Sequence, residues 1–277
     1  MRENAIYGLA ANDSDKRLLA KVLSGMLRDD PDPEVRRTCV YGLEGCGPDA
    51  APALIAALLD RYEPLREDAA AALGKLGPRA VPPLVAALRS PRAWQRQGAA
   101  RALGSIKSAD EAVLSGLTGL LGDPDESVRV AAANGLGGIG SAAAPAKRAL
   151  ASAMAGDSSP QVRSCCALAL AEIAPEDTVA ELAIRLADAD DSVRQMVAVA
   201  LGRIGPPAKK GNALANLTAC LHDRSQGVRV EAAIAIALID PERRMEMMEL
   251  LRKEAADPPN LRAYEALERL KATKPLR

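Results

Sequence analysis

The residue types that most often carry enzyme chemistry are sparse in this chain. The 277 residues contain one histidine, His222, and five cysteines with no metal-site spacing. The cysteines are Cys39, Cys46, Cys165, Cys166 and Cys220. One histidine cannot build a multi-histidine metal site, and no nucleophile with a base beside it is legible. We therefore expect no catalytic residue, no metal and no cofactor, although the many Asp and Glu residues leave a hidden carboxylate pair as an open alternative.

One glycine pattern resembles a nucleotide-binding motif. Gly135, Gly137 and Gly140 follow the G-x-G-x-x-G spacing of dinucleotide-binding loops. Such loops join a strand to a helix, whereas these glycines come at the end of a helical pattern. We therefore predict no nucleotide site here.

The pattern that ends in these glycines recurs along the chain. In the segment 123–140, Val128, Ala132, Leu136 and Ile139 stand at the spacing of one face of an amphipathic helix. Gly140 then supplies a left-handed stop. Copies of this segment follow one another at intervals of 30 to 35 residues, a period that indicates a solenoid. Further helical segments at 51–60, 81–90 and 177–188 lie between the copies, so each repeat is predicted to be a helical hairpin.

Two charged positions mark each copy of the repeat. The arginines that follow the first apolar residue are Arg2, Arg36, Arg66, Arg96, Arg129, Arg163, Arg194 and Arg229. The aspartates that precede them by six residues are Asp30, Asp60, Asp123, Asp157, Asp188 and Asp223. Ser90 takes the aspartate position in the remaining complete copy.

These residues resemble the HEAT-repeat superfamily, and within it the phycobilisome-lyase-like HEAT repeats. The resemblance implies an all-α, right-handed α-solenoid of about eight hairpins. It also implies a ladder of Asp and Arg side chains that ties neighbouring repeats together. The ladder would run through Asp30/Arg36, Asp60/Arg66, Asp123/Arg129, Asp157/Arg163, Asp188/Arg194 and Asp223/Arg229. A row of arginines could also follow a nucleic acid, but the accompanying aspartates favour the structural interpretation. The resemblance implies little about function, because the matching residues build the solenoid.

We expect residues 1–277 to form a single solenoid. Its predicted parts are the second helix of an incomplete repeat (1–12), the repeats 13–47, 48–77, 78–107, 108–140, 141–174, 175–205 and 206–240, and capping helices (241–277). The chain begins inside a repeat without a polar cap, so we expect a fragment of a longer protein. A homodimer through this open end is an alternative to a monomer.

Composition limits the classes of partner. The chain has 36 basic and 36 acidic residues, which argues against a general nucleic-acid or membrane-surface binder. No run approaches the ~20 apolar residues that span a bilayer. Several cysteines occupy core positions of the repeat, which favours a reducing compartment, and we expect the cytoplasm.

The predicted binding surface is the concave face lined by the second helices. Its outward positions become apolar from the fourth repeat onwards, where a polar surface would be usual. The ridge consists of Val130, Leu168, Val199, Val230, Ile234 and Leu238. An exposed apolar ridge indicates a groove for an amphipathic helix or extended peptide of a partner protein. The alternative is that these side chains belong to the core.

A second candidate surface surrounds the only tryptophan. Trp94 lies in a segment that replaces the usual acidic turn, with Arg92 and Arg101 nearby. Tryptophan and arginine are enriched in binding hot spots, but Trp94 could instead pack across the turn. Tyr7 and Tyr41 are further candidates, because they stand in line on the second helices.

These observations favour a non-enzymatic scaffold that binds a partner protein. Two alternatives stay open. A bilin lyase subunit would follow from the resemblance, and a DNA-binding protein similar to HEAT-like DNA glycosylases would use the arginines around Trp94.

Overall fold

The computed structural model describes residues 13–256 and 260–272, and within these ranges every regular element is helical. The all-α prediction is therefore confirmed. The predicted helix at 1–12, Tyr7 and the proposed dimer end lie outside the described residues.

The sixteen described α-helices form eight consecutive hairpins. The first four are α1 (Asp13–Asp29) with α2 (Pro33–Glu44), α3 (Ala51–Ala57) with α4 (Glu63–Leu76), α5 (Val81–Ala87) with α6 (Ala93–Ile106), and α7 (Glu111–Leu120) with α8 (Glu126–Ile139). The other four are α9 (Lys147–Gly156) with α10 (Pro160–Ile173), α11 (Val179–Arg185) with α12 (Asp191–Ile204), α13 (Ala213–Cys220) with α14 (Gln226–Ile239), and α15 (Arg244–Ala256) with α16 (Leu261–Ala272).

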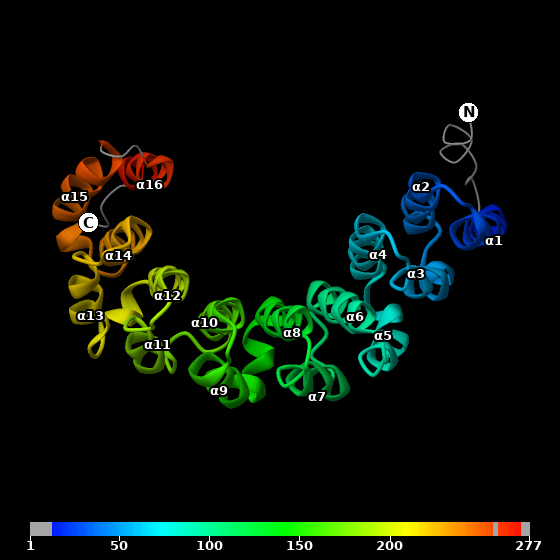
Figure 1. The fold of residues 1–277 in the computed structure, drawn as a ribbon, viewed down its shortest axis with the longest axis horizontal. Coiled ribbons are helices and arrows are strands. Elements are labelled where there is room, and N and C mark those ends of the chain that lie inside the picture. Colours follow the sequence, from blue (N-terminus) through cyan, green and yellow to red (C-terminus); the bar gives the residue numbers. More distant parts are fainter. Residues whose placement is uncertain (1–12, 257–259, 273–277) are drawn as a thin grey trace. The chain divides into compact units, whose positions relative to one another are not determined.

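The chain divides into two compact units, unit 1 up to Ala146 and unit 2 from Lys147. The boundary falls inside the predicted repeat 141–174, at the end of a 3-10 segment (Gly140–Ala146). Within unit 1, α2, α4, α6 and α8 pack side by side in one layer, and α1, α3, α5 and α7 form the other (Figure 1). Unit 2 repeats this arrangement with α10, α12 and α14 in the second-helix layer.

Local sequence explains where the second helices begin and end. Asp190 caps α12 by accepting a hydrogen bond from the Ser192 amide, and Asp125 caps α8 in the same way. Gly140 and Gly205 follow these helices with positive φ, a conformation that costs glycine little. In α8 and α12 the turn residues thus mark the start and the end of the helix.

One glycine of the G-x-G-x-x-G pattern, Gly135, serves helix packing together with the neighbouring Gly138. A Cβ atom on Gly104 of α6 would lie 2.5 Å from the Cα of Gly135 on α8, and a Cβ on Gly138 would lie 3.0 Å from the Gly104 carbonyl oxygen. Only glycine allows the two backbones to approach this closely. Gly104, Gly135 and Gly138 therefore allow two helices to pack closely, and Gly140 ends α8, as the context of the pattern predicted.

Four of the five cysteines are buried and Cys165 is half-buried. Burial raises the pKa of the Cys166 thiol to about 12 and that of Cys39 to about 11. Both thiols are protonated at neutral pH and fill space as small apolar side chains. None of the described helices has both the length and the apolar character that a membrane-spanning segment needs.

Candidate functional site

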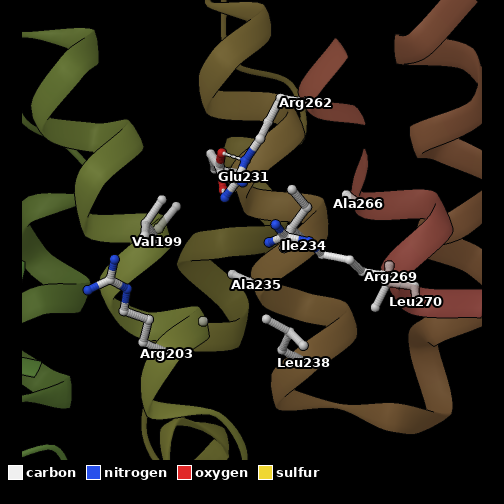
Figure 2. Close-up of a pocket in the computed structure, with 12 residues that line it drawn as sticks. Val199, Arg203, Glu231, Ile234, Ala235, Leu238, Arg262, Ala266, Arg269 and Leu270 are labelled. Atoms are coloured by element: carbon white, nitrogen blue, oxygen red, sulfur yellow. Dashed lines mark hydrogen bonds and ion pairs between the residues drawn. The ribbon is translucent and has the colours of Figure 1, made fainter. Parts of the chain in front are cut away.

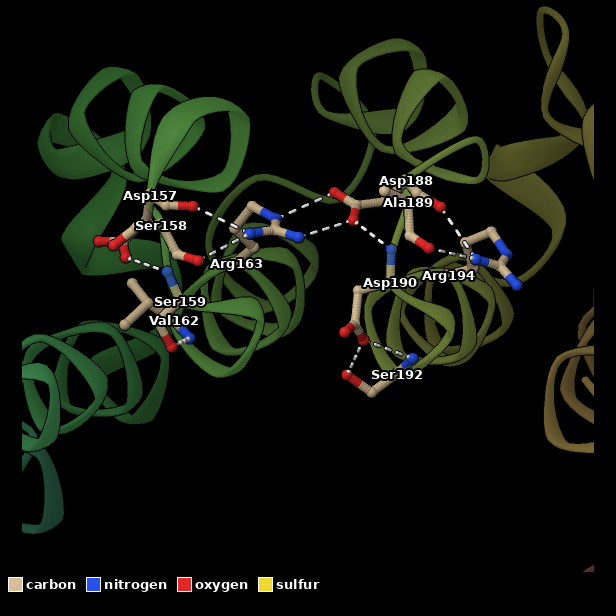
Figure 3. A network of polar contacts seen from close by, with 10 residues as sticks. All are labelled: Asp157, Ser158, Ser159, Val162, Arg163, Asp188, Ala189, Asp190, Ser192 and Arg194. Atoms are coloured by element: carbon tan, nitrogen blue, oxygen red, sulfur yellow. Dashed lines mark hydrogen bonds and ion pairs between the residues drawn. The ribbon is translucent and has the colours of Figure 1, made fainter.

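The repeated arginine connects two successive hairpins. Arg163 donates from Nη1 to the carbonyl oxygen of Asp157 at 2.9 Å, within its own hairpin turn (Figure 3). Its Nε and Nη2 donate to the two carboxylate oxygens of Asp188, in the next hairpin, at 3.0 and 2.7 Å. This two-point contact matches the planar fork of a guanidinium to a carboxylate. Each such arginine therefore holds its own turn through the backbone and the next turn through a side chain.

The same contact recurs in both units. Its members are Arg36 with Asp60, Arg96 with Asp123, Arg163 with Asp188, Arg194 with Asp223 and, at the last step, Arg229 with Glu254 of α15. We call these contacts the ladder, and each contact a rung. The ladder was expected to pair Asp188 with Arg194 inside one repeat, and this pairing is wrong. Arg194 contacts only the backbone carbonyl of Asp188, because that aspartate side chain faces the preceding arginine.

Each ladder aspartate also closes its own turn. Asp188 Oδ1 accepts a hydrogen bond from the amide of Asp190 at 3.0 Å, and Asp223 Oδ1 accepts one from Ser225 at 2.9 Å. The hydrogen bonds from Arg194 lower the pKa of Asp223, and the same contact raises the pKa of Arg194. Arg194 is 7% exposed, so the rung is a buried structural contact and leaves little surface for a ligand.

Part of the predicted ridge lines a groove in unit 2. The groove has a volume of about 420 Å³ and lies between α12, α14 and α16 (Figure 2). Its apolar floor contains Val199 from α12 with Ile234 and Leu238 from α14. Leu238 is 41% exposed, while the other two are partly exposed. The structure therefore places three of the six ridge residues along one cavity.

The other three ridge residues lie elsewhere. Val230 was predicted to be exposed, but it is 1% exposed, so for this residue the ridge prediction is wrong. The physical reason is that α14 packs against α15 and α16 of the last hairpin as well as against α12. Leu168 on α10 is half-buried outside the groove, and Val130 on α8 is half-buried in unit 1.

Arginines surround the apolar floor of the groove. Arg203, Arg262 and Arg269 line it, against one acidic residue, Glu231. Arg262 of α16 donates to Glu231 of α14 at 2.7 Å, and this hydrogen bond raises the pKa of Arg262. Arg203 pairs with Glu172 at 3.1 Å. The lining therefore has three arginines against one glutamate, and two of these arginines are already in ion pairs.

Sequence reasoning missed the contribution of α16 to this groove. The segment was predicted only as a closing cap, although Ala263, Ala266 and Leu270 stand three and four residues apart and are buried. That spacing is a signal for a helix face packed on a neighbour. It does not say which neighbour, because the apolar face could equally have covered α15 alone.

The secondary candidates lie in unit 1. Trp94 is 41% exposed, and the guanidinium carbons of Arg66 and Arg92 lie 5.7 and 5.8 Å from the centre of its ring. Arg101 pairs with Glu67 at 2.9 Å and lines the same small cavity as Trp94. The predicted cluster around the tryptophan is thus formed mainly by Arg66 and Arg92.

Tyr41 is held at the surface of α2. It is 43% exposed, and its hydroxyl donates to Asp68 of α4 at 2.7 Å. Arg37 donates to the same carboxylate and lies over the tyrosine ring. Tyr41 therefore takes part in a polar contact between neighbouring second helices.

Among the described residues, no group of three or more His, Cys, Asp and Glu side chains could hold a metal ion. His222 is exposed, just beyond the end of α13.

The sequence pattern of the family described as HEAT repeats matches residues 1–74, 19–104, 81–150, 114–199, 147–237 and 179–271. The chain therefore belongs to the HEAT repeats, and its fold is a HEAT-repeat solenoid. No curated protein matches the chain.

Solved structures show the same fold. The karyopherin Kap121p bound to the SUMO protease Ulp1p is similar, with a TM-score of 0.73 and 16% identity, over 93% of this chain and 33% of Kap121p. The chain thus spans about a third of the length of that protein. A chain of the CpcE–CpcF complex of phycocyanin lyase from Nostoc sp. PCC7120 is 24% identical, and the match covers 91% of this chain and 94% of the lyase chain. Its TM-score of 0.48 supports no functional argument for a bilin lyase.

Proposed function

We propose that this chain is a non-enzymatic scaffold that binds a short segment of a partner protein in the groove of unit 2. The observation that carries the proposal is the row of aliphatic side chains on the groove floor. Val199, Ile234 and Leu238 come from neighbouring helices and line one cavity, although they point away from the core of the hairpins.

The size and shape of the groove fit one or a few side chains of a peptide. A volume of about 420 Å³ lies within the range of pockets that hold specific ligands. A helix lying in such a groove presents apolar anchors at intervals of three or four residues. Gly202, which lacks a side chain, and Ala235 deepen the floor between α12 and α14, where a larger residue would fill the space.

The arginines indicate what should flank the apolar anchors. Arg203, Arg262 and Arg269 surround the floor, so acidic residues beside the anchors would meet opposite charge. The partner segment is therefore amphipathic, with an aliphatic face and acidic flanks.

Two further observations support a binding role. The similar protein Kap121p has been solved bound to Ulp1p and to Nup53p, so the HEAT fold holds protein partners there. The residues best suited to catalysis are also poorly placed for it, because the single histidine of this chain is exposed beside a turn and the buried thiols are protonated. We also place the chain in a reducing compartment such as the cytoplasm, since free buried cysteines persist there.

Site-specific photo-crosslinking tests the groove. A benzophenone amino acid replaces Leu238 on the groove floor, and a control variant carries it at Leu18, which is 65% exposed on α1. We expect crosslinks from position 238 to converge on one segment with aliphatic residues at helical spacing and acidic flanks. A synthetic peptide of that segment should bind the wild type at least tenfold more tightly than the Leu238→Glu variant. Equal products from positions 238 and 18 would contradict the proposal.

A further inference from the structure

The ladder is interrupted at one step in unit 1, between the second and third described hairpins. Arg66 stands at the ladder position of α4, and the next hairpin carries Ser90 where the other complete copies carry aspartate. The aspartate of a complete copy closes its own turn and also accepts hydrogen bonds from the arginine of the preceding hairpin, and Ser90 keeps only the first of these roles. Its Oγ accepts a hydrogen bond from the Arg92 amide at 3.2 Å, as Asp188 accepts one from Asp190. The turn is therefore preserved, while the carboxylate that would receive Arg66 is absent from the sequence.

Arg66 nevertheless holds the ladder orientation. Its Nη1 donates to the carbonyl oxygens of Asp60 and Arg61 at 3.0 and 3.1 Å, which are the same contacts that Arg194 makes in its own turn. Among the described residues, no carboxylate meets Nε or Nη2 of Arg66. These are the two donors that form the rung wherever the aspartate is present. The fork is thus positioned by the backbone before any anion reaches it.

The fork lies beside Trp94 and Arg92, and Glu63 and Glu67 line the same small cavity as Arg66 and Trp94. Trp94 lies 5.7 Å below the Arg66 guanidinium and 5.8 Å from that of Arg92, and it is 41% exposed. The turn segment 88–96 carries three arginines and no acidic residue, whereas the equivalent segment 186–194 carries three aspartates and one arginine. The turn of the interrupted step therefore carries positive charge and no carboxylate, which favours an acidic ligand.

We propose that Arg66, Arg92 and Trp94 form a second binding site, which takes an aspartate or glutamate carboxylate of a partner protein. The carboxylate completes the rung by accepting hydrogen bonds from Nε and Nη2 of Arg66. Trp94 contacts the apolar part of the partner chain, and Arg92 adds positive charge. The site lies in unit 1 and does not depend on the groove of unit 2. We infer a carboxylate ligand because, in each complete rung, the arginine donates to a carboxylate.

The first test supplies the carboxylate from the chain itself. Ser90→Asp restores the residue found at the other ladder turns, and Ser90→Asn is a matched neutral control of the same size. We expect Ser90→Asp to melt several degrees above Ser90→Asn at pH 7, because only the charged side chain completes the rung. Equal melting temperatures would show that the Arg66 fork accepts no carboxylate, and would overturn the proposal.

The second test supplies the carboxylate from outside. Trp94 is the only tryptophan in the chain, so its fluorescence reports on this site alone. The probe is a capped peptide with the sequence of residues 122–127, Gly-Asp-Pro-Asp-Glu-Ser, which contains the turn that Arg96 binds. The control peptide has Asn in place of its first Asp. We expect a saturable fluorescence change with the first peptide and at least tenfold weaker binding of the second.

Variants of the protein assign the effect to Arg66. Ser90→Asp and Arg66→Gln should each weaken peptide binding at least tenfold. Arg79→Gln, which removes one exposed charge elsewhere in unit 1, should leave it unchanged. Binding that is equal in wild type and Ser90→Asp would overturn the proposal. So would a response to duplex DNA with none to the acidic peptide, since that result would assign the basic patch to nucleic acid.

Discussion

Arg194 and Asp223 belong to successive hairpins of unit 2 and meet through two hydrogen bonds, Nε to Oδ2 at 2.7 Å and Nη2 to Oδ1 at 2.8 Å. Both side chains are less than a sixth exposed. Because Nη1 of the same arginine holds the carbonyl oxygens of Asp188 and Ala189, a single side chain fixes two turns at once. The ladder is therefore a stabilising element, and its contribution can be separated from that of ordinary surface ion pairs.

Removal of one ladder arginine should destabilise the protein strongly. Arg194→Ala leaves the Asp223 carboxylate partly buried without its guanidinium, at an expected cost of about 3 kcal/mol. Arg203→Ala removes an arginine of a half-exposed pair with Glu172, and the expected cost is below about 1 kcal/mol. Urea unfolding followed by circular dichroism compares the two. Similar losses in both variants would contradict a structural role for the ladder.

The rung should also make stability depend on pH. The hydrogen bonds from Arg194 lower the pKa of Asp223 below the value of about 3.9 in the unfolded chain. Its stabilising contribution is therefore complete above pH 5 and is lost as the pH falls through the folded-state pKa. The free energy of unfolding of wild type should exceed that of Arg194→Gln most at pH 7, and the difference should shrink between pH 4 and pH 2. A constant difference over this range would show that the charge of Asp223 is irrelevant.

Alanine substitutions of two glycines should have opposite effects on stability, because only one of them lies where α6 and α8 approach closely. Gly104→Ala places a methyl group against the backbone of Gly135, and overpacking of this kind costs about 1 to 3 kcal/mol. Gly119→Ala, in α7, meets no atom within 4 Å and should stabilise the helix by about 0.5 to 1 kcal/mol. Thermal melts of the two variants check the signs. A stabilising Gly104→Ala would mean that the two helices can separate at little cost.

Two residues of the predicted ridge should respond differently to a charge. Val230 is 1% exposed, so Val230→Glu buries a carboxylate and should cost about 4 kcal/mol or more. Leu238 is 41% exposed, and Leu238→Glu should change the free energy of unfolding by less than about 1 kcal/mol. Circular dichroism and melting temperatures separate the two outcomes. If Leu238→Glu also unfolds the chain, the groove floor is core and the proposed function fails.

The sequence pattern was sufficient to predict the helical hairpins because each carries its own local signals. The arginine and aspartate positions marked the turns, and Gly140 marked a helix end. The partner of each arginine could not be predicted in the same way. Arg194 is six residues from Asp188 and 29 from Asp223, and the spacing alone favours the nearer carboxylate. The choice depends on where the turn directs the aspartate side chain, which is a property of three-dimensional structure.

The candidate groove was predicted only in part for a similar reason. Val199, Ile234 and Leu238 were found because they point away from the core of their own hairpins. The burial of Val230 and the contribution of Arg262 depend on how α16 packs against α14, which the periodicity of either helix leaves open. The stacking of Arg66 on Trp94 was missed because an arginine without its aspartate has no fixed partner in the pattern.

The ladder also has a direction. Every complete rung joins the guanidinium of one hairpin to the carboxylate of the following one, and the last carboxylate is Glu254 of α15 instead of a turn aspartate. A hairpin of this kind offers the same donor on one side and the same acceptor on the other, so its junctions are chemically equivalent. Whole hairpins could therefore be duplicated, deleted or exchanged without creating an unmatched charge, provided that the cut falls between repeats. The junction at Ser90 breaks this equivalence, and so does the last junction, where Glu254 takes the place of the turn aspartate, so the hairpins at these two junctions are not interchangeable with the others.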